Sequence, residues 1–204
     1  MSYARYLIEQ NNGNNELMTL DEFCEYYELN DIKHALQEAL DTDELLDEAE
    51  GKQLVFKLWD KICDEIDGEE FSHAQQIRNR IKKIDGLLRD IEEEKKKVGK
   101  ERFAGKLGFH WSFLKRMIIR LGESLAAGAA VGIFSIPFGS VGALGAYSTG
   151  LGLDVARFIM NTLDRIKIVW TWANYNSILT HYEKRLRSTR NRLQRQLDDF
   201  NKHR

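Results

Sequence analysis

The chain has 204 residues, of which 43% are hydrophobic and 30% are charged, so it can form a packed core with a charged surface. It contains one proline and no segment in which apolar and polar residues alternate for long. This pattern argues against a β-rich fold and predicts an all-α protein. The two cysteines, Cys24 and Cys63, are far apart in the sequence, and we expect both to be buried, reduced thiols.

The formal net charge of −2 hides a strong asymmetry along the chain. Residues 1–75 contain 20 Asp/Glu and five Lys/Arg, whereas residues 76–204 contain 12 Asp/Glu and 25 Lys/Arg. Two interpretations follow from this division. Either the acidic and basic parts attract each other within the protein, or the basic part binds an anionic partner.

The first predicted unit, residues 1–70, is an acidic lobe of three helices. Thr19 and Glu22 have the spacing of a capping box and therefore predict the start of the first helix. The stretch IKHALQEAL predicts a second helix. A third is expected from Asp43 to about Ile66, followed by an Asp-Gly pair that ends the unit.

Two long helices are predicted in residues 71–105 and 166–204. In each of them, apolar side chains recur at spacings of three and four, as in a heptad repeat. We expect the two helices to pair antiparallel as a stalk; alternatively, each lies separately on the surface of a core. The residues of the two apolar seams are Ile77, Ile81, Ile84, Leu88, Ile91 and Val98 in the first helix, and Leu179, Tyr182, Leu186, Thr189, Leu193, Leu197 and Phe200 in the second.

Between these helices, in residues 106–165, lies a stretch from Ser124 to Leu153 without one charged side chain, SLAAGAAVGIFSIPFGSVGALGAYSTGLGL. As a single helix it would extend about 45 Å, which exceeds the hydrocarbon thickness of a bilayer, about 30 Å. Pro137 interrupts the stretch, so we expect a helical hairpin with its tip near this residue. The small residues that would let the two arms approach closely are Gly128, Gly132, Gly142 and Gly150.

Two pairs of opposite charges, each with i,i+3 spacing, bracket the predicted hairpin. Arg120 and Glu123 precede it, and Asp154 and Arg157 follow it. Each pair can form along its own helix, and the four residues can also pair across the two arms. Because burial of such charges is costly, we expect them to set the depth to which the hairpin enters a membrane.

Tryptophans and basic residues lie outside the predicted arms. Trp111 precedes the hairpin, and Trp170 and Trp172 follow it, so these side chains are predicted to occupy the lipid headgroup interface. Both flanks are basic, which predicts that both termini lie on the cytoplasmic side of a membrane. The same Gly/Ala-rich pattern also fits a buried hairpin in a soluble bundle or in the seam of a ring-shaped oligomer.

The apolar stretch, flanked by long charged helices, resembles the apolar hairpin of colicin-type pore formers. It is also similar to segments of phage tail ejection and tape-measure proteins. The resemblance concerns residues 124–153 and is one of composition, without a fixed motif. It implies a protein that is soluble, or packaged in a virion, before it delivers its hairpin into a membrane.

Sequence signatures of catalysis are missing from the chain. The Gly-Lys pairs lack the spacing of a phosphate-binding loop, and the five histidines show no metal-ligand spacing. We therefore expect no enzyme, no metal, no cofactor and no small-molecule substrate. The basic stretch KRLRSTRNRLQRQ near the C-terminus is a candidate for binding nucleic acid without sequence preference. An anionic membrane surface and the acidic lobe of a neighbouring subunit are its alternative partners.

The leading hypothesis is a non-enzymatic, membrane-inserting protein that forms or lines a conduit as a homo-oligomer. A phage ejection component is its most specific version, and such a protein would be packaged in a virion before insertion. The alternative hypothesis is a soluble oligomeric scaffold whose apolar hairpins pack against each other at a subunit interface.

Overall fold

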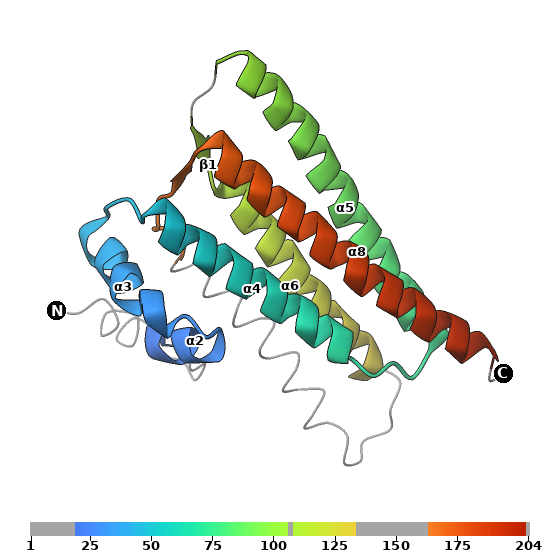
Figure 1. Ribbon diagram of the computed structural model, residues 1–204. Coiled ribbons are helices and arrows are strands. Elements are labelled where there is room, and N and C mark those ends of the chain that lie inside the picture. The colour runs from blue at the N-terminus through green and yellow to red at the C-terminus, as the bar shows by residue number, and fades with distance from the viewer. Residues whose placement is uncertain (1–18, 106–107, 134–162, 203–204) are drawn as a thin grey trace.

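The computed structural model describes residues 19–105, 108–133 and 163–202. These residues are mostly helical, which confirms the all-α prediction. Four long helices form a bundle (Figure 1). They are α4 (Glu48–Gly68), α5 (Ala74–Phe103), α6 (Ser112–Ile133) and α8 (Trp172–Lys202).

The order of the bundle follows from the contacts between its helices. Helices α4 and α5 each pack against both α6 and α8. Three of the helices, α4, α6 and α8, run in one direction, and α5 runs in the opposite direction (Figure 1). The shorter helices α2 (Leu20–Tyr26) and α3 (Lys33–Thr42), with a 3₁₀ turn at Asn30–Ile32 between them, lie beside α4.

The two heptad helices pair antiparallel as predicted, but they do so within the four-helix bundle and not as a separate stalk. Helices α5 and α8 have the most extensive contact in the molecule and run antiparallel (Figure 1). The predicted seam residues of both helices are buried, apart from Phe200, which is half-buried. The same core includes Trp59 of α4, whose ring stacks on Tyr182 at a centroid distance of 3.8 Å. Its indole N–H donates to the Tyr182 carbonyl at 3.3 Å.

The start of the acidic lobe has the predicted capping box. The Glu22 amide donates to the Thr19 hydroxyl at 3.2 Å, and the Thr19 amide donates to the Glu22 carboxylate at 2.7 Å. The third helix begins later than predicted, at Glu48. Asp43 has a φ of +60°, a left-handed conformation that ends α3, and the Asp47 carboxylate caps α4 by accepting from the Ala49 amide at 2.7 Å.

A single cluster of buried apolar residues includes side chains from every one of these helices, from Leu20 in α2 to Leu197 in α8. Helix α4 of the acidic lobe is therefore also part of the four-helix bundle. Both cysteines lie fully buried in this cluster, as expected. Burial raises the pKa of the Cys24 thiol to about 11 and that of the Cys63 thiol to about 12, so both stay protonated near neutral pH.

Candidate functional site at the base of the apolar segment

Two short strands join the two flanks of the apolar segment. Strand β1 (Phe109–His110) pairs antiparallel with β2 (Val169–Trp170), placing Phe109 opposite Trp170 and His110 opposite Val169. We call β1, β2 and the adjoining residues Trp111 and 163–168 the strap. The strap ties residue 109 to residue 170, although 60 residues lie between them in the sequence.

Side chains strengthen the strap on the side of α6. The Trp111 indole N–H donates to the Ile166 carbonyl at 2.9 Å, and the Lys115 ammonium forms an ion pair with Asp164. Burial lowers the pKa of Lys115. On the other side, the Leu46 amide donates to the Lys167 carbonyl at 2.9 Å. The strap thus joins α6, the acidic lobe and the start of α8 at one end of the bundle.

Helix α6 leaves the strap and packs into the bundle. Its apolar residues Leu114, Met117, Ile118 and Leu121 are fully buried, and the helix contacts α4 and α5. With 22 residues, α6 is about 33 Å long. Ile133 therefore ends α6 at the opposite end of the bundle from the strap (Figure 1).

The charges before the apolar stretch are balanced by α5. Arg120 forms an ion pair with Asp90 of α5. Glu123 is exposed and lies close enough to influence Lys83 of α5. Burial and the nearby Arg80 lower the pKa of Lys83, and the Glu123 carboxylate opposes that change. In this conformation, the ion pair from Arg120 to Asp90 therefore helps to hold α6 against α5.

The structure places the predicted interfacial tryptophans against protein. Trp111 and Trp170 are buried in the core, and Trp172 is half-buried, with the Arg102 guanidinium 3.8 Å from the centre of its ring. In this conformation, neither Trp111 nor Trp170 is available to lipid. Contact with lipid would require the strap to open.

The remaining predicted residues of the hairpin lie partly outside the described residues. Gly128 and Gly132 belong to α6. The residues for which the structure gives no placement are Pro137, Gly142, Gly150, Asp154 and Arg157. Among the described helices, none combines the length and the apolar character that a membrane span requires.

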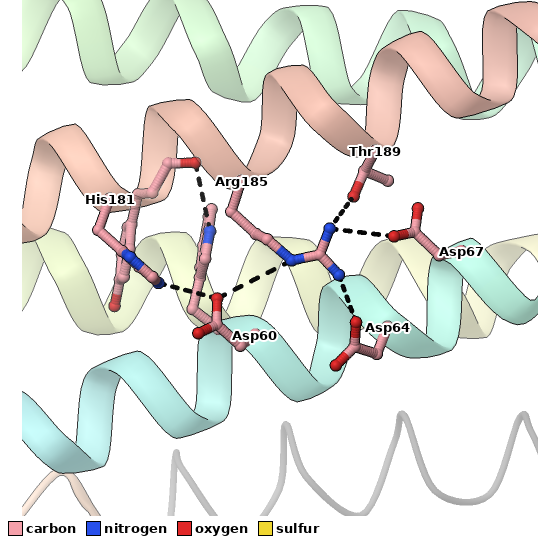
Figure 2. Close-up of polar contacts among 8 residues, drawn as sticks. Asp60, Asp64, Asp67, His181, Arg185 and Thr189 are labelled. Atoms are coloured by element: carbon pink, nitrogen blue, oxygen red, sulfur yellow. Dashed lines mark hydrogen bonds and ion pairs between the residues drawn. The ribbon is translucent and has the colours of Figure 1, made fainter.

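A polar seam between α4 and α8 joins the acidic and basic parts of the chain (Figure 2). The Arg185 guanidinium of α8 lies between three carboxylates of α4. It donates to Asp67 at 3.0 Å and to Asp64, and it lies 3.9 Å from Asp60. It also donates to the Thr189 hydroxyl at 3.3 Å. The aspartates recur at spacings of four and three, which places them on one face of α4.

His181 extends this seam by one turn toward the strap. Its Nε2 lies 2.8 Å from an Asp60 carboxylate oxygen, and its ring stacks on Phe56 at a centroid distance of 4.1 Å. Nearer the strap, Thr171 donates from its amide and its hydroxyl to the Glu48 carboxylate. These contacts confirm the interpretation that the acidic and basic parts attract each other within the protein.

The same contacts use much of the basic stretch considered for nucleic acid. Arg185 binds the aspartates of α4. Arg187 pairs with Glu92 and Glu183, and Arg190 pairs with Asp85. The basic side chains that remain exposed without an ion pair to any described residue are Lys184, Arg192 and Arg195. A phosphate backbone would therefore meet a smaller cationic surface than the sequence suggests.

In residues 19–105, 108–133 and 163–202, no group of three or more His, Cys, Asp or Glu side chains is arranged to hold a metal ion. Comparison with protein-family models, with curated proteins and with solved structures finds no match to this chain. The distinctive feature of the described residues is therefore the strap, which pairs residues 109–110, before the uncharged stretch, with residues 169–170, after it.

Proposed function

We propose that this protein is a non-enzymatic helical protein that inserts its apolar segment into a membrane and forms or lines a conduit as a homo-oligomer. The observation that carries the proposal is the strap. It holds residues that precede and follow the uncharged stretch at one place, so that α6 and the residues after it leave and rejoin the rest of the chain at a single junction. A phage ejection component is the most specific form of this proposal.

The bundle would serve as the storage form of α6. Burial of one large apolar side chain stabilises a protein by about 1.5–3 kcal/mol, so removal of the four buried apolar side chains of α6 into water would cost about 6–12 kcal/mol. That cost is comparable to the whole stability of a typical domain. In water the closed bundle should therefore predominate, and release of α6 requires an apolar environment that receives it.

Flotation with anionic liposomes tests the proposal. Purified protein is bound to vesicles, washed with high salt and then with alkaline carbonate, and floated. Protein with an inserted segment stays with the lipid. The matched control is Ala143→Lys, which places a charge in the middle of the uncharged stretch and should abolish resistance to carbonate. If the unaltered protein washes off with carbonate, membrane insertion is refuted.

A soluble oligomeric scaffold is the second candidate, and the Arg120–Asp90 ion pair favours it. Arg120 has its ion-pair partner within the bundle, so the apolar continuation of α6 can meet the same segment of another subunit instead of lipid. Light scattering distinguishes the two candidates. A stable oligomer without lipid, which dissociates when Ala143 is replaced by Lys and does not resist carbonate on vesicles, supports the scaffold.

A further inference from the structure

Three large apolar side chains are exposed in the described part of the chain. They are Leu45, Phe103 and Val169, with exposed fractions of 62%, 93% and 42%. The Leu45 backbone forms a bridge to Lys167, Val169 belongs to β2, and Phe103 ends α5 six residues before β1. Phe103 is by far the most exposed of the three.

The chain around Phe103 forms a projecting tip. Helix α5 extends past the start of α8 at this end of the bundle (Figure 1). Immediately after Phe103, Ala104 and Gly105 are exposed, and Gly105 has a φ of +83°, a left-handed conformation that suits glycine and turns the chain back toward β1. Because its ring is so exposed, Phe103 adds almost no buried apolar surface to the protein's own core.

The last turns of α5 are basic. From residue 95 to residue 105 there are five Lys/Arg and one acidic residue, Glu101. Two of the lysines are neutralised, Lys95 by Glu183 and Lys97 by Glu94. Lys96 and Lys100 are exposed and form no ion pair with any described residue.

Arg102 adds a third cation next to the aromatic ring. It is exposed, and its guanidinium is held over the face of Trp172. The tip therefore combines one exposed aromatic ring with three exposed cations. Phenylalanine is a common apolar anchor at the boundary between headgroups and acyl chains, and lysine and arginine favour anionic lipid surfaces.

We propose that the end of α5 is a docking tip for anionic membranes. Phe103 enters the headgroup region, while Lys96, Lys100 and Arg102 bind anionic lipid headgroups. This inference deepens the proposed function and rests on it for the membrane as partner. Because the tip lies beside the strap, docking would place both flanks of the apolar segment at the lipid surface while the bundle is still closed.

Two pairs of full-length variants test the tip by flotation with phosphatidylcholine vesicles that contain phosphatidylglycerol. Phe103→Ser should weaken partitioning about tenfold, because the ring loses its burial in lipid. Its control is Leu45→Ser, which removes another exposed apolar side chain beside the acidic Asp43 and Glu44, and should partition like the unaltered protein.

The second pair tests the charges. Each lysine near an anionic surface contributes about fivefold to partitioning, so Lys96→Glu with Lys100→Glu should weaken binding by at least about 25-fold. The control, Arg192→Glu with Arg195→Glu, changes the net charge equally but on a distant turn of α8, and should weaken binding less than threefold. Equal effects of the two double variants, or normal binding of Phe103→Ser, would overturn the docking tip.

The readouts separate this inference from the proposed function. Salt-sensitive flotation measures docking, and resistance to carbonate measures insertion. If the tip variants fail to dock but the docked unaltered protein washes off with carbonate, the docking tip is supported and membrane insertion is refuted. If the tip variants dock and insert like the unaltered protein, membrane insertion is supported and the docking tip is refuted. Absence of any binding to the vesicles overturns both.

Discussion

The packing of the strap against α4 can be tested by adding a single methyl group to α4. Gly51 is buried in α4, and a Cβ at this position would lie 2.9 Å from Cδ1 of Ile168 and 3.0 Å from the ring of Trp170. Both of these strap side chains are themselves almost fully buried, so neither can move aside freely. Gly51→Ala should therefore destabilise the protein.

The magnitude follows from two opposing effects. Alanine is favoured over glycine in a helix interior by about 0.5–1 kcal/mol. Overpacking a well-packed core costs about 1–3 kcal/mol. The contacts of the added methyl group are close enough that we expect overpacking to prevail, with a net destabilisation of about 1–2 kcal/mol.

Gly86 of α5 provides the matched control, because a Cβ there meets nothing within 4 Å. Gly86→Ala should stabilise the protein by about 0.5–1 kcal/mol. The assay is urea unfolding followed by far-ultraviolet circular dichroism. If Gly51→Ala stabilises the protein as much as Gly86→Ala does, then Ile168 and Trp170 do not pack against α4, and the described strap is wrong.

Three further predictions concern the core and the ion pairs. In native protein, neither Cys24 nor Cys63 should react with a thiol reagent at pH 8, because burial raises both pKa values. Both should react in urea. Fast reaction of either thiol in the native state would contradict its burial. The hydrogen bond from Lys95 lowers the pKa of Glu183 below its ordinary value of 4.5. This stabilisation is complete above pH 4.5 and is lost as the pH falls through the lowered pKa. Below pH 4.5, the melting temperature of Glu183→Gln should therefore fall less steeply than that of the unaltered protein. Parallel curves of melting temperature against pH would refute this. Arg185→Leu leaves the α4 aspartates without their cation and should lower the free energy of unfolding by about 1–3 kcal/mol. The measurement is urea unfolding at neutral pH. An unchanged free energy of unfolding would show that the polar seam contributes little to stability.

The structural features that were predicted correctly from the sequence are those that depend on local periodicity. The 3.6-residue period of apolar side chains identified the seams of α5 and α8, and the spacing of Thr19 and Glu22 identified the first cap. Such patterns act within one helix, where neighbours in sequence are neighbours in space. The antiparallel pairing of the two heptad helices was predictable because both carried a continuous apolar seam.

The strap was not predicted, because its strands have two residues each and pair Phe109 with Trp170 and His110 with Val169, far apart in the sequence. A signal exists in retrospect. Short runs of aromatic and β-branched residues, FHW and IVW, flank the apolar segment symmetrically. The seam between α4 and α8 also had a signal, since Asp60, Asp64 and Asp67 share one helix face and His181 and Arg185 share another. Which face meets which depends on tertiary packing.

The sequence could not decide the environment of α6, because an apolar side chain suits a protein core and a lipid phase alike. Either environment would suit the four buried apolar side chains of α6, which are Leu114, Met117, Ile118 and Leu121. The charges are more informative, since they need partners. The ion pair from Arg120 to Asp90 places the first half of α6 in the bundle in this conformation.

The most direct measurement places an environment-sensitive fluorophore on a cysteine at position 143, in the middle of the uncharged stretch. Because Cys24 and Cys63 are buried, labelling of the unaltered protein under the same conditions serves as the control for labelling at position 143. Anionic vesicles that carry nitroxide-labelled acyl chains are then added. If the segment inserts, the emission shifts to the blue and the nitroxides quench it. If the protein binds the vesicles while the emission stays unshifted and unquenched, the segment remains outside the bilayer and the proposed function is wrong.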